Sequence, residues 1–474
     1  MSVEKKQMIT LDKVIVKNLF GNLNYDINFK TDRSDLSILI APNGCGKTTI
    51  FRLINFVFNP CALTYKNICD VPFESFSCVL SNGKIITLIH EKRWGNADDK
   101  NIDGDNQLGD EEIMDTLVHY AEELNSDRWS LTINEKTKRI TIKPTYYKQE
   151  DELLPSIRKR SNFYINRAFR QFKDFLKENE CAMAVFFLGT DRINHIDLPI
   201  SFDSLTIDDN GPVMSTLKYV KISSASIMKR LRANFNMAMQ KAQINLAWKF
   251  LDQTVVTPNF ESFEKRWKEY RSEIENYAAT LRFCHVKDII KREHYENFEK
   301  IYNDKSDFLE LYLNEFEKAL RPIRNEFPKF KLLKDIFDER NMPTQKTLVY
   351  SDRNGIEIMQ EGKIIPLEKL SSGEKNDMIM FYLLIFVYNR KKVLDNLDSE
   401  DDRISNDMQV AKNVASTGCL ILIDEPELSL HIEWQESFLD YLITIQGMNQ
   451  FQSIVATHSP NIINDHLDLI AEKR

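Results

Sequence analysis

Leu36-Ser-Ile-Leu-Ile-Ala41-Pro-Asn-Gly-Cys-Gly-Lys47-Thr48-Thr49 is the stretch that decides the fold. Its apolar first half is typical of a buried strand, and the residues after Lys47 repeat apolar positions at helical spacing. Between them lies a turn with two glycines, which lets the backbone curl so that its N–H groups point inward. The stretch therefore predicts a strand, a phosphate-binding loop and a helix, as found in α/β nucleotide-binding folds.

The loop supplies the first group of candidate site residues. Lys47 is expected to reach the β- and γ-phosphates of a nucleotide, and Thr48 is expected to bind Mg²⁺. Ala41 stands where the usual pattern has its first glycine, and we expect the loop to tolerate this small side chain. The residues expected to hold the nucleotide are Asn43, Gly44, Cys45, Gly46, Lys47, Thr48 and Thr49.

A second motif delivers two carboxylates at the end of an apolar run. Residues 420–423 are Leu-Ile-Leu-Ile, and Asp424, Glu425, Pro426 and Glu427 follow them. Asp424 is expected to hold Mg²⁺ through water, and Glu425 to orient and deprotonate an attacking water. The alternative interpretation is an acidic pair that merely caps a strand at a turn.

Two shorter motifs have weaker individual signals. Ser371 and Gly373 stand where a helix begins, so they could donate hydrogen bonds to a γ-phosphate; alone, they also fit an ordinary N-cap. His458 follows the apolar run 453–456 and could contact a γ-phosphate, although a histidine there could equally be a turn residue.

The four motifs occur together and in order, and in this the sequence resembles the ABC-type ATPases. The resemblance implies Walker A, signature, Walker B and switch-histidine motifs, with ATP and Mg²⁺ as cofactors. It also implies a homodimer in which two subunits sandwich two ATP molecules head to tail. Ser429-Leu430-His431 resembles the loop that crosses this interface, and Phe20 is expected in the core or, alternatively, near the adenine. The glutamine of the Q-loop has no clear counterpart.

The resemblance implies an α/β fold, a P-loop ATPase head of mixed sheets with an antiparallel β lobe, and the spacing of the motifs leaves room for an α-helical insertion. Lys47 and Ser371 are 324 residues apart, and apolar residues recur at helical spacing between about 215 and 340. We therefore expect three parts, namely residues 1–210 of the head, a helical insertion at 211–345, and residues 346–474 of the head.

Composition restricts the setting. The chain of 474 residues has a net charge of −8, which does not favour a nucleic-acid binder as a whole. No run approaches 18 apolar residues, and the seven scattered cysteines contain no CxxC pair. We expect a cytoplasmic protein with reduced thiols and no membrane partner.

The motif string from Asp424 to His431 resembles the branch that contains SMC-like repair, RecF and overcoming-lysogenization-defect ATPases. A chain of this size and pattern is similar to the stand-alone ATPase subunits of the PARIS or, alternatively, Septu anti-phage systems. Only 16 residues (474 − 458) follow His458. The resemblance therefore implies a higher oligomer, a separately encoded Toprim or HNH nuclease as effector, and a phage protein as possible trigger.

A competing hypothesis is a DNA-repair ATPase that binds DNA ends, for which a basic groove is expected. Basic residues cluster at Lys159-Arg160, Lys229-Arg230-Arg232 and Lys291-Arg292, but such clusters are usually solvated helix faces. A scaffold with vestigial hydrolysis is disfavoured because both Lys47 and Glu425 are present.

Overall fold

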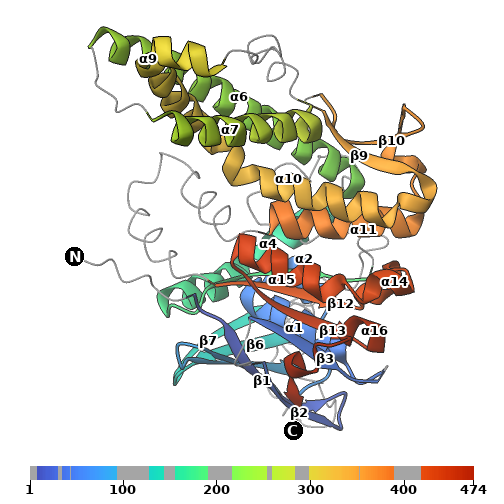
Figure 1. The fold of residues 1–474 in the computed structure, drawn as a ribbon. Helices are drawn as coiled ribbons and strands as arrows, with labels where there is room; N and C mark the ends of the chain where they lie inside the picture. The colour runs from blue at the N-terminus through green and yellow to red at the C-terminus, as the bar shows by residue number, and fades with distance from the viewer. Residues whose placement is uncertain are drawn as a thin grey trace, which may run out of the picture. The chain divides into compact units, whose positions relative to one another are not determined.

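The computed structural model describes residues 8–29, 35–42, 44–92, 127–142, 155–190, 216–252, 259–282, 298–351, 353–388 and 418–473. The chain divides into two compact units (Figure 1). The α/β unit contains residues 1–213 and 387–474, and the helical unit contains residues 214–386. The two are described separately below.

A parallel sheet forms the centre of the α/β unit. Its strand order is β3-β13-β12-β8, and each neighbouring pair runs in parallel. Parallel sheets are covered on both faces, which explains why β12 and β13 are buried along their whole lengths. The strands are β3 (Leu36–Ile40), β8 (Met183–Leu188), β12 (Gly418–Asp424) and β13 (Gln452–Thr457).

A second sheet of the same unit is antiparallel, in the order β14-β2-β1-β4-β5-β6-β7. It contains two hairpins, in which β4 pairs with β5 and β6 pairs with β7. Its strands are β1 (Leu11–Leu19), β2 (Leu23–Asn28), β4 (Ser75–Leu80), β5 (Ile85–Lys92), β6 (Asp127–Ile133), β7 (Lys136–Ile142) and β14 (Glu472–Lys473).

The helix after the phosphate-binding loop packs into the core that both sheets share. This helix is α1 (Lys47–Phe58), and its buried apolar residues belong to one cluster with residues of β1, β6, β12 and β13. The ring of Phe56 lies 5.2 Å from that of Trp129 and 5.1 Å from that of Phe169. Such aromatic contacts fix α1, and with it the loop at its N-terminus. The other helical segments are α2 (Ala62–Lys66), α4 (Pro155–Glu178), α14 (Ile432–Gln435), α15 (Phe438–Asn449), α16 (Pro460–Ile463) and the 3₁₀ turns Pro426–Ser429 and Leu467–Leu469.

The helical unit combines long helices with one small sheet. The antiparallel sheet has the order β11-β10-β9, and helix α6 contacts α9 and β10. The elements are α6 (Thr216–Leu251), α7 (Phe260–Leu281), α9 (Phe298–Ala319), α10 (Arg321–Arg340), β9 (Lys346–Ser351), β10 (Gly355–Gln360), β11 (Lys363–Ile365), α11 (Ser372–Tyr382), a π-helical turn Leu383–Val387, and the 3₁₀ turns Met342–Thr344 and Leu367–Lys369.

The predicted α/β fold with an antiparallel β lobe and a helical insertion is confirmed. The units nevertheless divide differently from the expected parts, because residues 346–386 group with the helical unit. One cause is a close approach of the β9–β10 turn to α6. The backbone N–H of Ile356 donates to the hydroxyl of Ser224 at 3.0 Å. A Cβ on Gly355, whose φ is +71°, would lie 2.1 Å from that hydroxyl oxygen, so only glycine allows this packing.

Candidate nucleotide-binding site

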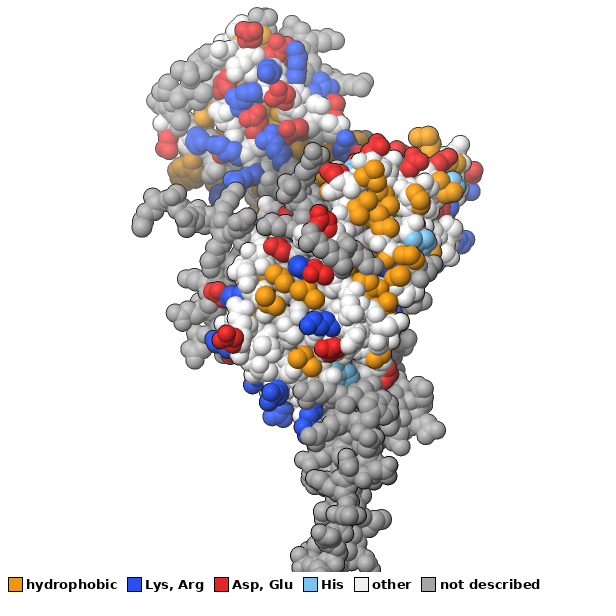
Figure 2. Space-filling view, turned by 90° about the horizontal axis from the view of Figure 1, so that it is seen from below, with side chains coloured by type: hydrophobic (Ala, Val, Ile, Leu, Met, Phe, Trp, Pro, Cys, Tyr) orange, Lys and Arg blue, Asp and Glu red, His pale blue; other side chains and the backbone are white. Residues whose placement is uncertain are grey.

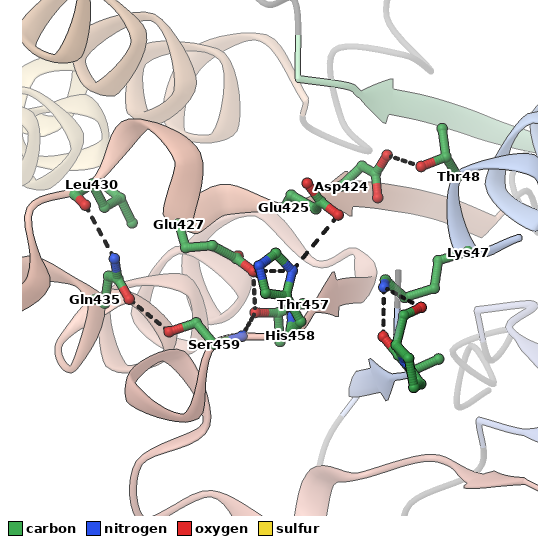
Figure 3. Close-up of polar contacts among 12 residues, drawn as sticks. Lys47, Thr48, Asp424, Glu425, Glu427, Leu430, Gln435, Thr457, His458 and Ser459 are labelled. Carbon is green, nitrogen blue, oxygen red and sulfur yellow. Dashed lines mark hydrogen bonds and ion pairs between the residues drawn. The ribbon is translucent and has the colours of Figure 1, made fainter. Parts of the chain in front are cut away.

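The ends of three neighbouring strands bring the candidate residues together. Lys47 follows β3, the two acids lie at the end of β12, and His458 follows β13 (Figure 3). The register pairs Thr457 with Ile40 and Asp424 with Ala456, so all three strands end at one edge. Ligands of open α/β sheets bind at this edge, outside the carboxyl ends of the strands.

The phosphate-binding loop is shaped by its glycines. Gly44 has a φ of +82° and Gly46 a φ of +79°, which are left-handed values that favour glycine. Gly46 is also the N-cap of α1, where a Cβ would lie 3.0 Å from the Leu19 side chain. The hydroxyl of Tyr25 donates to the carbonyl of Cys45 at 2.7 Å and ties the loop to β2. Asn43 lies outside the described residues.

The ammonium group of Lys47 is held inside its own loop. Its Nζ donates to the carbonyl of Ala41 at 2.6 Å and to that of Pro42 at 3.3 Å, and the residue is buried. A buried ammonium needs such partners, because an unpaired one would be strongly destabilising. The arrangement keeps a positive charge at the base of the loop, where phosphate groups would lie.

Thr48 and Asp424 meet although they are 376 positions apart in the sequence. The Thr48 hydroxyl donates to Oδ2 of Asp424 at 2.6 Å, and Asp424 is almost fully buried. A hydroxyl and a carboxylate beside a phosphate loop are the hard oxygen donors that suit Mg²⁺, which takes few protein ligands and completes its shell with water and phosphate oxygens. Among the described residues, no group of three or more His, Cys, Asp or Glu side chains could hold a metal by itself.

Glu425 adopts a backbone conformation that is unusual for its residue type. Its φ is +46°, and its N–H donates to the carbonyl of Ala456 at 2.8 Å. Left-handed conformations of non-glycine residues cost energy and cluster at functional sites. Its Oε1 lies 3.7 Å from Nδ1 of His458, whose side chain is about half exposed.

Glu427 lies in the site, although its motif alone predicts no role for it. Its Oε1 lies 2.8 Å from the hydroxyl of Thr457, 3.0 Å from the backbone nitrogen of His458 and 3.2 Å from Nδ1 of the same histidine (Figure 3). The signal available was the last residue of the Asp-Glu-Pro-Glu string, which is a second glutamate. Its partners, however, depend on the pairing of β12 with β13.

Ser371 and Gly373 belong to the helical unit, at the N-terminus of α11. The predicted N-cap is confirmed: the Ser371 hydroxyl accepts from the Glu374 N–H at 3.2 Å, and Glu374 accepts from the Ser371 N–H at 2.7 Å. Burial opposes the charge of Glu374, but hydrogen bonds from Lys346 and Ser371 outweigh it, so the pKa of Glu374 is lowered. The role of both residues at a γ-phosphate stays a prediction.

The expectation of a core position for Phe20 is wrong. Phe20 is 44% exposed and has a φ of +55°, because the chain turns directly after β1. Its ring lies 3.2 Å from the point that a Cβ on Gly46 would occupy. The alternative, an aromatic ring beside the nucleotide, therefore stays open.

Comparison with known proteins gives one family. A model of the AAA ATPase domain matches residues 9–463. No curated protein matches the chain. Among solved structures, the chain is similar to Smc head domains. One, from Pyrococcus furiosus and bound to the C-terminal domain of ScpA, has 13% identity and a TM-score of 0.32, with 98% of this chain and 96% of that chain covered. Another, from Pyrococcus yayanosii, has 12% identity and a TM-score of 0.34, with coverages of 98% and 97%.

Within the described residues, no helix has the length and hydropathy needed to span a membrane.

Proposed function

Because the chain belongs to the AAA ATPase domain family and is an ATPase, we propose that it binds ATP with Mg²⁺ at the loop of residues 41–49. The observation that carries the proposal is the meeting of Lys47, Thr48, Asp424, Glu425 and His458 at one edge of the parallel sheet. Nucleotide-binding α/β proteins use this edge, and the residue types match the charges of a triphosphate.

Each residue has a role that its surroundings allow. The loop N–H groups and Lys47 bind the phosphates, and Thr48 and Asp424 hold Mg²⁺. Bound there, the ion supplies positive charge that offsets the phosphate charge. Glu425, which is one-fifth exposed at its side chain, orients a water and accepts its proton. His458 contacts the γ-phosphate.

The replacement Glu425→Gln tests the proposed role of this site. The amide keeps the size of the side chain but cannot accept the proton of a water, so ATP turnover should fall about 100-fold or more. ATP binding, measured by fluorescence of a labelled nucleotide, should persist. The matched control is Glu436→Gln, which changes an exposed acid of the same segment. Unchanged turnover in Glu425→Gln would contradict the assignment of the base.

The proposed active form is a dimer in which Ser371 and Gly373 of one copy complete the ATP site of the other. Its support is apolar exposure next to the site. Leu428 is 63% exposed and directly follows the Asp-Glu-Pro-Glu string, and Ile432, four residues further on, is 62% exposed. Separate patches of exposed hydrophobic side chains are also visible in Figure 2. Large apolar side chains beside a polar site are typical of protein interfaces. ATP bound between two copies stabilises their association.

The proposed output of this assembly is control of a separate effector, a Toprim or HNH nuclease, in bacterial anti-phage defence. Beyond the motif resemblance, support comes from one face of α6. Its exposed apolar residues follow the spacing of a partner-binding helix: Met237, Ile244, Trp248 and Leu251. The test is co-expression with nucleases encoded beside the gene. A nuclease that co-purifies with the wild type but less with Trp248→Ser would support the proposal. If the replacement leaves the complex unchanged, this face of α6 is not the binding site.

DNA binding, as in a repair ATPase, is the second candidate function, and one observation favours it. Helix α6 contains seven Lys or Arg and no Asp or Glu. Lys221, Lys229 and Arg353 line a hollow of about 370 Å³, and none of the described residues lining it is acidic. Lys291 and Arg292 lie outside the described residues, as do the side chains of Lys159 and Arg160.

The test of the DNA hypothesis is binding of a labelled duplex to the purified chain at increasing salt. The double replacement Lys221→Gln with Lys229→Gln should weaken binding and reduce its salt dependence. The control is Lys331→Gln, an exposed lysine that pairs with Asp335. If both variants bind the duplex equally, the hollow is not the DNA-binding site.

A further inference from the structure

Glu427 connects two segments that follow neighbouring strands. It lies in the 3₁₀ turn after β12. Its Oε1 is within 3.2 Å of three polar atoms at the end of β13 and directly after it: the Thr457 hydroxyl, the His458 backbone nitrogen and the His458 ring nitrogen Nδ1. Glu427 is 9% exposed. A buried carboxylate with this many partners is held in one position.

These contacts restrict the histidine ring. Nδ1 of His458 lies 3.2 Å from Oε1 of Glu427, and because an ionised carboxylate only accepts hydrogen bonds, a hydrogen bond between these two atoms requires the proton on Nδ1. A neutral imidazole has one ring proton, and the nitrogen that carries it is set by the hydrogen bond it makes. Nε2 of a neutral His458 then has its lone pair on the other side of the ring. Within the described residues, no hydrogen bond or ion pair of Nε2 is found.

A second carboxylate also faces Nδ1, but it is less well placed. Oε1 of Glu425 is 3.7 Å away, against 3.2 Å for Glu427. Glu427 is also anchored by Thr457 and by the backbone of His458 itself. The ring therefore keeps its partner when Glu425 engages a water, and the two acids have separate tasks.

We propose that Glu427 is a positioning residue, which fixes the ring of His458 with its proton on Nδ1 and turns Nε2 toward the γ-phosphate. The inference rests on the proposed role of His458 at the nucleotide. Glu427 immediately precedes the exposed Leu428, so a change in that turn would also move the carboxylate that holds the ring. Histidines that bind ions are oriented in the same way, by an acceptor at the second ring nitrogen.

The direct test determines which ring nitrogen of His458 carries the proton. Nitrogen NMR of the full chain with labelled histidine, at a pH of about 8 where free imidazole is neutral, distinguishes the two tautomers; His458→Gln identifies the signal. The wild type should carry its proton on Nδ1. Glu427→Ala should shift it to Nε2, whereas Glu427→Gln should keep it on Nδ1, because its amide oxygen still accepts. A wild-type ring with its proton on Nε2 would overturn the proposal.

The rate of ATP turnover provides a second, independent test of the role of Glu427. Glu427→Ala should lower kcat about 10- to 100-fold, the usual effect of losing an orienting partner, with KM for ATP changed less than about twofold because the loop is untouched. Glu427→Gln should restore most of the rate. In the His458→Ala background, Glu427→Ala should not lower kcat further, because each replacement alone already removes the Glu427–His458 pair. An additive loss would overturn the proposal.

The outcomes separate this inference from the proposed function. If Glu425→Gln and His458→Ala abolish turnover while Glu427→Ala does not, only the role of Glu427 is wrong. If His458→Ala leaves turnover intact, the proposed role of the histidine is itself wrong. Glu436→Ala serves as the control for loss of an exposed acid in this segment.

Discussion

The hydroxyl of Thr48 lies 2.6 Å from a carboxylate oxygen of Asp424. This contact joins the second residue of α1 to the last residue of β12. It places two hard oxygen donors together before any ion is bound, so little rearrangement is needed to hold Mg²⁺. The contact also explains the burial of Asp424, since a buried carboxylate requires a hydrogen-bond donor.

Thr48→Ala should therefore raise the Mg²⁺ concentration that gives half-maximal turnover. Loss of one ligand and of the hydrogen bond to Asp424 removes about 1–2 kcal/mol, which corresponds to roughly a 5- to 30-fold shift. Titration of MgCl₂ at fixed ATP measures it. Thr48→Ser keeps the hydroxyl and should behave as the wild type; a large shift in that variant would contradict the assigned role of the hydroxyl.

The sequence predicts those parts of the site that depend on local order. Apolar runs identify β3, β12 and β13, and the glycines of the loop require left-handed φ values that the structure contains. The partners of Glu427 could not be predicted in this way. They lie 30 and 31 positions away and become neighbours only through the parallel pairing of two strands.

The unit boundary and Phe20 show two other sources of error. Residues 346–386 have no local signal that groups them with α6; one contact that joins them is that of Gly355 with Ser224, which are 131 positions apart (355 − 224). For Phe20 a signal did exist, because Gly21 and Asn22 follow it and favour a turn. The apolar character of Phe20 suggested burial, but the turn leaves its ring 44% exposed.

Asp377→Ala should destabilise the helical unit strongly. Asp377 of α11 accepts a hydrogen bond from Arg340 of α10, and both side chains are buried. The Arg340 guanidinium also lies 4.6 Å from the ring centre of Phe381. Removal of Asp377 takes this ion pair away from the buried guanidinium, and breaking a buried pair by removing one partner costs about 3–5 kcal/mol. Urea unfolding of the full chain measures the loss. The double variant with Arg340→Met should recover part of it; a double variant less stable than Asp377→Ala would contradict this explanation.

Glu315 should make the helical unit sensitive to acid. Burial opposes its charge, but hydrogen bonds from Lys249, Lys318 and Asn245 outweigh burial and lower the pKa of Glu315 from 4.5 to about 2. Since the folded pKa is below the unfolded one, the ionised form stabilises the unit fully above pH 4.5, and this contribution is lost as the pH falls toward 2.

The variant Glu315→Gln isolates this effect. Its unfolding free energy should be lower than that of the wild type by about 1–2 kcal/mol at neutral pH, allowing for solvent around the two lysines. The difference should shrink as the pH is lowered from 6 to 3 in urea titrations. The exposed pair of Glu264 and Lys268, 2.6 Å apart, provides the control Glu264→Gln, which should change stability little at any pH. A difference that grows toward low pH would contradict the assignment.

Leu428→Ser combined with Ile432→Ser should weaken ATP-dependent dimers without unfolding the protein. Both side chains are more than 60% exposed in the single chain, so their replacement removes little buried surface from the monomer. In a dimer, burial of each large apolar side chain contributes about 1.5–3 kcal/mol, so losing both should weaken association at least tenfold. Sedimentation with ATP, in the Glu425→Gln background that retains nucleotide, measures the monomer–dimer equilibrium. Leu467→Ser changes a side chain that is 68% exposed outside this segment and should have no effect. Equal dimerisation of the double variant and this control would place the interface elsewhere, whereas a selective loss would locate it beside Glu427 and His458.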